Sequence, residues 1–456
     1  MNVQENRPLN LHRERCLLVL GALVVAAVLL SAVALAGCGS AVSPTPTRPS
    51  QESTTTAIST TTPLTTTPSP APTPVEPPSS VPLTVWGPLQ FSPGEADAAQ
   101  LLLQAQYQSF AESADVLEVE YVPRAAYGDS GVVNFLLNAS YAAPSLLPDL
   151  AIVDPFELQS LVREGLPQPI GDLISEELIE DLYPFAREAC SSDGRLVCVQ
   201  FEADIEHVVY YTGALEEPPV TWADLFTEAI SYTFPAAGVG GLVNDTFLIQ
   251  YLAQGGQLHD EQGAPSLDDS TVQRVLRLYD AVRRWDVSPP SILGLATLDD
   301  CWKVYTGGNI TVSHMSSHQY LVSRSVMRET DFAAVPTETG APATMSRGWA
   351  FVILAQSPER QEAAADLVEW LMLPENLSLW SEASNHLPTR RSALSMVGWP
   401  REYEDFLDNQ LESAFHRPSG TQFQRIARAL QTAVEAVLTE ELTPREATAQ
   451  VMESLE

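Results

Sequence analysis

Hydrophobic positions divide the chain into three unequal parts. Residues 17–37 form an apolar stretch without a charged side chain, whereas residues 38–80 consist mostly of Ser, Thr and Pro. From residue 82 onward, short apolar runs alternate with amphipathic stretches, as in packed strands and helices. We therefore expect a folded region of about 375 residues, large enough for two lobes of ordinary size.

The first part of the folded region alternates between strand and helix patterns. Residues 83–88, LTVWGP, and residues 148–155, PDLAIVDP, are short apolar runs that end in turn residues, and residues 116–123 alternate apolar and acidic side chains. Residues 94–110 and 131–143 show helical spacing. The order strand, helix, strand, helix, strand predicts an open α/β sheet.

In open α/β sheets, ligands bind outside the carboxyl ends of the strands. This predicts a binding edge formed by Trp86, residues 124–128 and Asp154. Later segments are mainly helical, and Ser-Pro at 357–358 and Thr-Pro at 443–444 are typical helix starts.

Residues 201–207, FEADIEH, concentrate acidic side chains. If this segment is extended, Glu202, Asp204 and Glu206 share one face. The row is compatible with contacts to ligand hydroxyls or a hinge, with a solvated surface, or with an acid/base pair. A zinc site would require more His or Cys at defined spacing, so we expect no metal.

Charge and motifs exclude several classes of function. The formal charge of −34, from 24 Lys and Arg against 58 Asp and Glu, would repel a phosphate backbone, so we expect no nucleic-acid binding. The glycine-rich residues 238–245, GVGGLVND, lack the third glycine of a dinucleotide fingerprint, and the chain has no Gly-Lys-Ser/Thr motif. We expect no nucleotide and no other cofactor.

Three of the five cysteines lie in the folded region. Cys190 and Cys198 flank an Asp-Gly pair that favours a hairpin turn. In an oxidising compartment they either form a disulfide or remain two thiols, because their cross-strand offset is not fixed by the sequence. Cys301 is expected to be a free thiol in the core.

Several segments, taken in order, resemble the family 1 extracellular solute-binding proteins, the receptors of ABC importers that mostly carry sugars, including the maltose-binding type. They include LTVWGP, PSLLPDLAIVD, NDTFLIQYLAQGGQL, VYTGGNITVSHMSSHQYL and WLMLPENLSLWSEASNHLPTRRSAL. The resemblance extends over nearly all of residues 82–456, and its specificity lies in the ordered set.

The resemblance implies an α/β fold of the periplasmic-binding-protein type, with two lobes, three interlobe crossings and a central ligand cleft. The crossings would lie near residues 201–204, 333–337 and 385–389. One lobe would contain residues 82–203 and 338–385, and the other would contain residues 204–332 and 386–456.

The resemblance also implies which residues contact the ligand. They lie at strand ends, at the first crossing, in the second lobe and in the turn after the second crossing: Trp86, Asp154, Glu202, Asp204, Asn244, Asp245, Ser313, Ser316, Gly348 and Trp349.

The implied function is capture of a carbohydrate or polyol by a monomer and its delivery to an ABC permease, without catalysis. Two alternatives remain open. One is a sensory or adhesive surface lipoprotein with a degenerate cleft. The other is an extracellular glycoside hydrolase that uses two of Glu202, Asp204 and Asp154.

Residues 1–37 have the layout of a signal peptide. The apolar stretch is also long enough to span a membrane, but a stop-transfer segment would more often end in Lys or Arg. Leu35-Ala36-Gly37-Cys38 resembles the bacterial lipobox, which implies cleavage before Cys38 and a lipid on that residue. Residues 38–80 would then be a disordered linker that tethers the protein to the extracytoplasmic face of a bacterial membrane.

Overall fold

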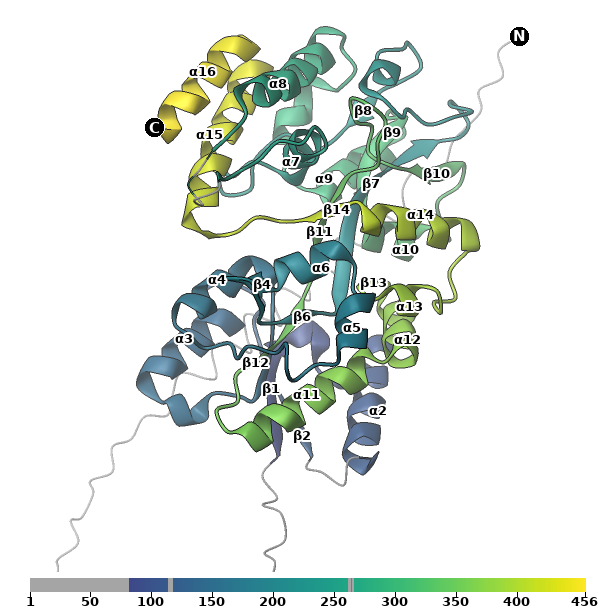
Figure 1. The fold of residues 1–456 in the computed structure, drawn as a ribbon. Coiled ribbons are helices and arrows are strands. Elements are labelled where there is room, and N and C mark those ends of the chain that lie inside the picture. The colour runs from purple at the N-terminus through teal and green to yellow at the C-terminus, as the bar shows by residue number, and fades with distance from the viewer. Residues whose placement is uncertain (1–81, 114–117, 261–263, 265) are drawn as a thin grey trace, which may run out of the picture. The chain divides into compact units, whose positions relative to one another are not determined.

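The computed structural model describes residues 82–456 apart from residues 114–117, 261–263 and 265 (Figure 1). The expected signal peptide, the linker and Cys38 lie outside the described residues, so these expectations stay predictions. The described part contains a five-stranded sheet, a seven-stranded sheet and a two-stranded hairpin.

The first sheet has the strand order β2-β1-β3-β12-β6. Its strands are β1 (Leu83–Pro88), β2 (Val119–Arg124), β3 (Leu150–Val153), β6 (Val199–Gln200) and β12 (Ala350–Ile353). β1 pairs in parallel with β2 and β3, while β12 runs antiparallel to β3 and β6. Helices follow β1 and β2 in the chain, so the predicted alternation of strands and helices is confirmed.

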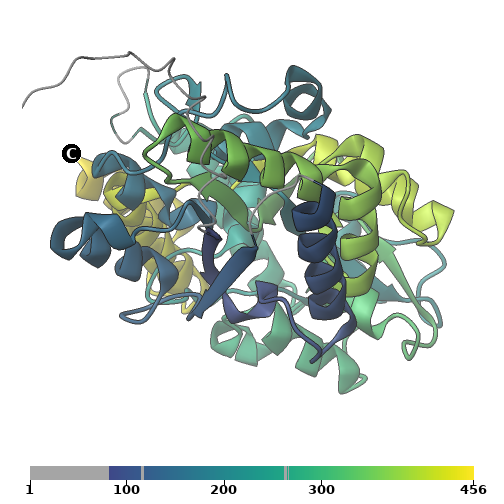
Figure 2. The ribbon, with the colours of Figure 1, turned by 90° about the horizontal axis from the view of Figure 1, so that it is seen from below.

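Both faces of this sheet are covered by helices. The strand β3 shows this, because all four of its residues are apolar and buried and successive side chains point to opposite faces. Leu150 and Ile152 face one core cluster, and Ala151 and Val153 face another. Seen from below, α3 and α4 lie on one side of the strands, and α2, α11 and α12 lie on the other (Figure 2). The helices are α2 (Ala98–Ser113), α3 (Val132–Ala142), α4 (Pro155–Arg163), α5 (Glu176–Asp181), α6 (Pro184–Ala189), α11 (Pro358–Met372), α12 (Pro374–Ser384) and α13 (Arg391–Leu394).

The second sheet is built around β7, which has ten residues and pairs with β9, β10, β11 and β13. Its strands are β7 (Glu202–Tyr211), β8 (Tyr232–Thr233), β9 (Val312–Ser316), β10 (Thr330–Ala333), β11 (Thr344–Arg347), β13 (Leu387–Pro388) and β14 (Ala414–His416). Around it lie α7 (Asp245–Leu252), α8 (Asp269–Arg284), α9 (Leu298–Thr306), α10 (Ser317–Ser323), α14 (Arg401–Glu412), α15 (Gly420–Leu438) and α16 (Pro444–Leu455). Short 3-10 helices are η1 (Leu89–Phe91), η2 (Pro144–Leu146), η3 (Trp222–Leu225) and η4 (Pro290–Gly294).

Three chain segments run between the two sheets. The chain passes from β6 to β7 at Phe201, and β13 pairs with the beginning of β7. The second crossing differs from the expected position near residues 333–337. β11 pairs with β7 through Ser346 and Arg347, so the chain returns to the first sheet only after Arg347. The expected boundary at residue 338 therefore places β11 with the wrong sheet, and the other lobe boundaries stay predictions.

Cys190 and Cys198 form a disulfide with a Cα–Cα distance of 4.9 Å. The hairpin between them consists of β4 (Ser191–Ser192) and β5 (Arg195–Leu196), and its turn residues Asp193 and Gly194 have the positive φ angles that such turns require. The thiol of Cys301 is free and buried. No helix in the described part of the chain is long and apolar enough to span a membrane.

Candidate functional site

A cleft of about 470 Å³ opens between the two sheets. The first sheet and its helices contribute the ends of β3 and β6, the start of α4 and the turn before β12, while the second sheet contributes β7, β11 and β14. The lining residues are Gln90, Tyr127, Asp154, Pro155, Phe156, Glu157, Ala189, Gln200, Glu202, Asp204, Ser346, Arg347, Gly348, Trp349, His386, His416 and Arg417.

Glu202 and Asp204, the first and third residues of β7, line the cleft. Asp204 Oδ1 accepts hydrogen bonds from Ser317 Oγ at 2.7 Å and from the His318 backbone N–H at 2.9 Å, so its position is fixed by the start of α10. Glu202 is only 3 % exposed, and its Oε2 has no hydrogen-bond partner among the described residues. Burial, together with the charges of Asp204 and Asp154, raises the pKa of Glu202 well above its usual value.

Asp154 is the N-cap residue of α4, and it lines the cleft. Its side chain accepts a hydrogen bond from the Phe156 backbone N–H at 2.8 Å and another from the Tyr127 hydroxyl at 2.7 Å. Burial raises the pKa of Asp154, and these two hydrogen bonds oppose the shift. Burial and the nearby Asp154 charge also raise the pKa of Glu157 to about 7.

Two guanidinium groups share one buried carboxylate at the second-sheet wall. Arg347 Nε donates to Asp245 Oδ2 at 2.6 Å, and Arg417 Nε lies 3.3 Å from Asp245 Oδ1. Burial alone would raise the pKa of Asp245, but the two arginines lower it below its usual value, so this carboxylate is ionised. Both ion pairs use Nε, and the terminal Nη groups make no hydrogen bond to another described residue, so they can donate to a ligand.

An aromatic pair lies beside these charges. The rings of Tyr127 and Trp349 are 5.6 Å apart between centroids. Trp349 follows Gly348, where a Cβ atom would lie 1.9 Å from the Glu202 carbonyl oxygen. Glycine is therefore required at this turn, because it lets the chain approach the β6–β7 crossing and present the indole to the cleft.

Two histidines stack at the third crossing. The rings of His386 and His318 are 4.1 Å apart and nearly parallel, and His386 Nε2 lies 3.5 Å from Glu202 Oε1. His318 Nδ1 lies 3.0 Å from the carbonyl oxygen of Asn385. Burial and the neighbouring His318 lower the pKa of His386 to about 4, so its ring is neutral at pH 7.

The structure brings five of the ten predicted contact residues into the cleft: Asp154, Glu202, Asp204, Gly348 and Trp349. Trp86 is not among the lining residues. Its half-buried indole packs against α3 and carries the Arg124 guanidinium 4.6 Å from the ring centroid. Trp86 does lie near the end of β1, as predicted, but its side chain packs against the core and does not line the cleft.

The other four predicted contacts act behind the cleft wall. Asn244 and Ser316 are the N-caps of α7 and α10, and their side chains accept hydrogen bonds from the backbone N–H groups of Phe247 and Gln319. Ser313 is fully buried in β9. Asp245 is also buried, but it holds Arg347 and Arg417 in place as described above.

Sequence reasoning missed several lining residues. Phe156 and Glu157 directly follow Asp154, so the strand-end rule could have named them, as it did for Tyr127 within the expected edge at residues 124–128. Gln200, His386, His416 and Arg417 gave no such signal. They reach the cleft from short strands or crossings whose neighbours are distant in the chain.

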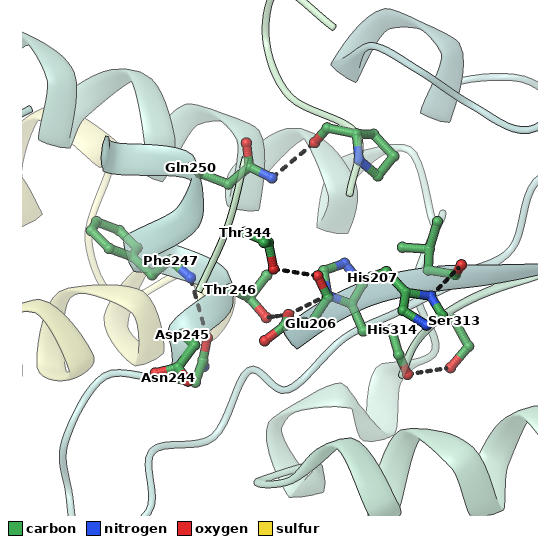
Figure 3. A network of polar contacts seen from close by, with 12 residues as sticks. Glu206, His207, Asn244, Asp245, Thr246, Phe247, Gln250, Ser313, His314 and Thr344 are labelled. Carbon is green, nitrogen blue, oxygen red and sulfur yellow. Dashed lines mark hydrogen bonds and ion pairs between the residues drawn. The ribbon is translucent and has the colours of Figure 1, made fainter. Parts of the chain in front are cut away.

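A second polar cluster is enclosed around Glu206, further along β7 (Figure 3). Glu206 accepts a hydrogen bond from Thr246 Oγ1 at 2.7 Å and contacts His314 Nδ1, while His314 Nε2 contacts the Tyr232 hydroxyl. Thr344 Oγ1 donates to the Glu206 carbonyl oxygen at 2.5 Å. Residues 82–456, with the gaps given above, contain no group of three or more His, Cys, Asp or Glu that could hold a metal ion.

Comparisons with known proteins place this geometry in a family. The family described as bacterial extracellular solute-binding protein matches residues 105–405. The maltotriose-binding protein of Pyrococcus abyssi (strain GE5 / Orsay) is 29% identical over 127 residues, which is 26% of this chain and 28% of that protein. The match thus spans little more than a quarter of that relative's length.

Solved structures share the fold at low sequence identity. The cyclic α-maltosyl-1,6-maltose binding protein from Arthrobacter globiformis has a TM-score of 0.68 at 18% identity, with 83% of this chain and 98% of that chain covered. The sugar-binding protein MalE from Xanthomonas citri has a TM-score of 0.68 at 17% identity, covering 82% and 97%. They confirm the predicted two-lobed α/β fold, and the family match shows that the chain belongs to the bacterial extracellular solute-binding proteins.

Proposed function

We propose that this protein is the extracytoplasmic receptor of an ABC importer, which binds a carbohydrate or polyol as a monomer and delivers it to a membrane permease. The observation that carries the proposal is the composition of the cleft. Carboxylates from both walls and guanidiniums from the second-sheet wall line the cleft together with the aromatic pair Tyr127 and Trp349. Such a mixture suits a ligand with many hydroxyls and an apolar ring face.

Each group has a distinct task in this proposal. Asp154 and Asp204 accept hydrogen bonds from ligand hydroxyls, the Nη groups of Arg347 and Arg417 donate to ligand oxygens, and Trp349 covers an apolar face of the ring. No bond of the ligand is made or broken. The carbohydrate-binding proteins named above have the same fold, which supports this choice of ligand class.

Closure of the cleft couples binding to transport. In the described part of the chain three segments run between the sheets, and the lining residues come from both sides. A ligand that contacts both walls stabilises a closed arrangement, because only there are all of its contacts made at once. The permease would recognise this closed arrangement.

The proposal also gives the N-terminal segment a task. A lipid on Cys38 and the Ser/Thr/Pro-rich linker after it would keep the receptor near its permease. Mass spectrometry of the mature protein checks this directly. A chain that begins at a lipid-modified Cys38 supports the anchor, whereas an intact Met1 or an unmodified Cys38 contradicts it.

Isothermal titration calorimetry with neutral mono-, di- and oligosaccharides tests the ligand class. Asp154 and Asp268 each accept a hydrogen bond at the start of a helix, but only Asp154 lines the cleft. Asn preserves a helix cap, so Asp154→Asn should weaken sugar binding at least about tenfold and the matched Asp268→Asn should not. No saturable binding across the panel, or equal effects of the two variants, would contradict the proposal.

A further inference from the structure

Glu202 is a buried carboxylate whose partners are incomplete. Its side chain lines the cleft at 3 % exposure, and Oε2 has no hydrogen-bond partner within the described residues. The contact of Oε1 is His386 Nε2, at 3.5 Å. A desolvated carboxyl group in this state is costly unless something that enters the cleft completes its contacts.

The surroundings of Glu202 are rich in further negative charge. Asp204 and Asp154 both act on it electrostatically, and both disfavour its ionised form. Glu157, on the opposite wall, also has a buried oxygen, Oε2, without a hydrogen-bond partner in the described part of the chain. His386 does not compensate, because its buried ring is neutral at pH 7.

The two guanidiniums of the cleft share a carboxylate behind its wall. Arg347 and Arg417 both pair with Asp245, which is itself buried and ionised. Part of their charge is therefore already balanced behind the wall. Four carboxyl groups line the cleft against these two guanidiniums, so a fully neutral ligand would leave the Glu202 end without a cation.

Resting on the function proposed above, we infer that the ligand is a carbohydrate that carries a protonated amino group, and that this ammonium group binds to Glu202 and Asp204. A hydroxyl could also donate a hydrogen bond to Glu202 Oε2, but an ammonium ion donates up to three hydrogen bonds and in addition balances the charge of the ionised carboxylate. Asp204 Oδ2 accepts no hydrogen bond from the described residues and lies on the same face of β7, which gives the ammonium a second acceptor.

Binding of such a ligand releases a proton. In the free protein burial and the facing groups Asp204 and Asp154 raise the pKa of Glu202 and so favour its protonated form, and the facing His386 is neutral. When the ammonium group enters, the Glu202 O–H bond breaks, the proton passes to the buffer, and the carboxylate pairs with the ammonium. A neutral sugar makes no such demand, so proton release distinguishes the two ligand classes.

Calorimetry of the full chain with matched disaccharides tests this inference. The probes are glucose disaccharides, α-1,4 or β-1,4 linked, each in the unmodified, the 2-amino-2-deoxy and the 2-acetamido-2-deoxy form. We expect the amino form of the accepted linkage to bind at least about tenfold tighter than the other two. Titration in buffers of different ionisation enthalpy should show release of about one proton for that form alone.

Two variants assign the effect to Glu202. Glu202→Gln should abolish both the preference for the amino form and the proton release. Glu453→Gln removes one negative charge from an exposed position on α16 and should keep both. If neutral sugars bind and the amino forms bind no tighter, the inference is wrong and the proposed function stands. If no sugar binds, the proposed function is wrong and the inference is wrong with it.

Discussion

Glu202, Asp204 and Glu206 occupy alternate positions on one face of β7, yet they serve different ends. The first two line the cleft, whereas Glu206 is 5 % exposed and enclosed by Thr246, His314 and Thr344. Two pleats of the strand separate Glu202, whose Oε2 has no hydrogen-bond partner among the described residues, from Glu206, whose Oε1 contacts both Thr246 and His314. The pattern of residue types is the same, so the partners from other elements decide what each carboxylate does.

The difference follows from what covers β7 along its length. Near Glu202 the strand emerges from the first sheet and borders β13 and the cleft. Glu206 pairs with Ser316 of β9 and lies under the N-terminus of α7, which carries Thr246. A buried carboxyl group that faces the cleft with an unpartnered oxygen costs stability until a ligand arrives, whereas an enclosed one that is hydrogen-bonded to neighbouring elements supports the fold.

The largest effect should come from Glu206→Ala. Removal of this carboxylate leaves His314 and Thr246 without their buried partner, so the free energy of unfolding should fall by about 3–5 kcal/mol. Urea unfolding measures the loss. Glu453→Ala, on the exposed face of α16, is the control and should change the value by less than about 0.5 kcal/mol. If the two variants are equally stable, the enclosed cluster does not support the fold.

A smaller effect, dependent on pH, should come from His207, which β7 places on the opposite face. Its buried ring packs against Tyr320, Tyr403 and Phe406, and burial lowers its pKa to about 4. His207 therefore binds a proton near pH 6.5 in the unfolded chain but only near pH 4 in the folded protein. Stability should fall by up to about 3 kcal/mol between pH 6.5 and pH 4 on account of this residue.

His207→Gln tests that origin. The variant should be less stable than the natural chain at pH 7, because two hydrogen-bonding contacts are altered, but the gap should shrink as the pH falls toward 4.5. Chemical unfolding at pH 7, 5.5 and 4.5 measures the gap. The raised pKa of Glu157 acts in the opposite direction and is common to both proteins. A gap that stays constant with pH would rule out His207 as the source.

The hydrophobic pattern of the sequence was enough to predict strands, helix starts and the residues that share one face of a strand. The alternation of apolar runs predicted the β1, β2 and β3 sheet, and the period of two placed Glu202, Asp204 and Glu206 on one face. The helix starts at Ser357 and Thr443 were also placed correctly, although only Thr443 makes the side-chain cap hydrogen bond. Each of these depends on neighbours within a few residues.

Pattern failed where a role depends on contacts between distant segments. Asn244 and Ser316 were predicted as ligand contacts and are helix caps outside the cleft lining, and nothing near Arg417 in the chain shows that it meets the cleft. The second crossing was misplaced because the pairing of the four-residue strand β11 with β7 is not visible in its own sequence. These features required the structure.

The smallest change in stability should come from substitutions of the two carboxyl groups that line the cleft, Glu202 and Asp204. Glu202 has a raised pKa, so its protonated form is favoured in the folded protein, and the stability that this gives below about pH 4 is lost as the pH rises. Glu202→Gln keeps the shape and removes the group whose ionisation burial opposes, and it should therefore raise stability by about 1 kcal/mol at pH 7 and by almost nothing at pH 4. Asp204→Asn should instead lower stability, because Asp204 accepts hydrogen bonds from Ser317 and His318. Opposite signs in urea unfolding at pH 7 would show that Glu202, unlike Asp204 two residues later, is held in the cleft at a cost to the fold, while a loss of stability in Glu202→Gln would mean that its carboxyl group already has the partners it needs.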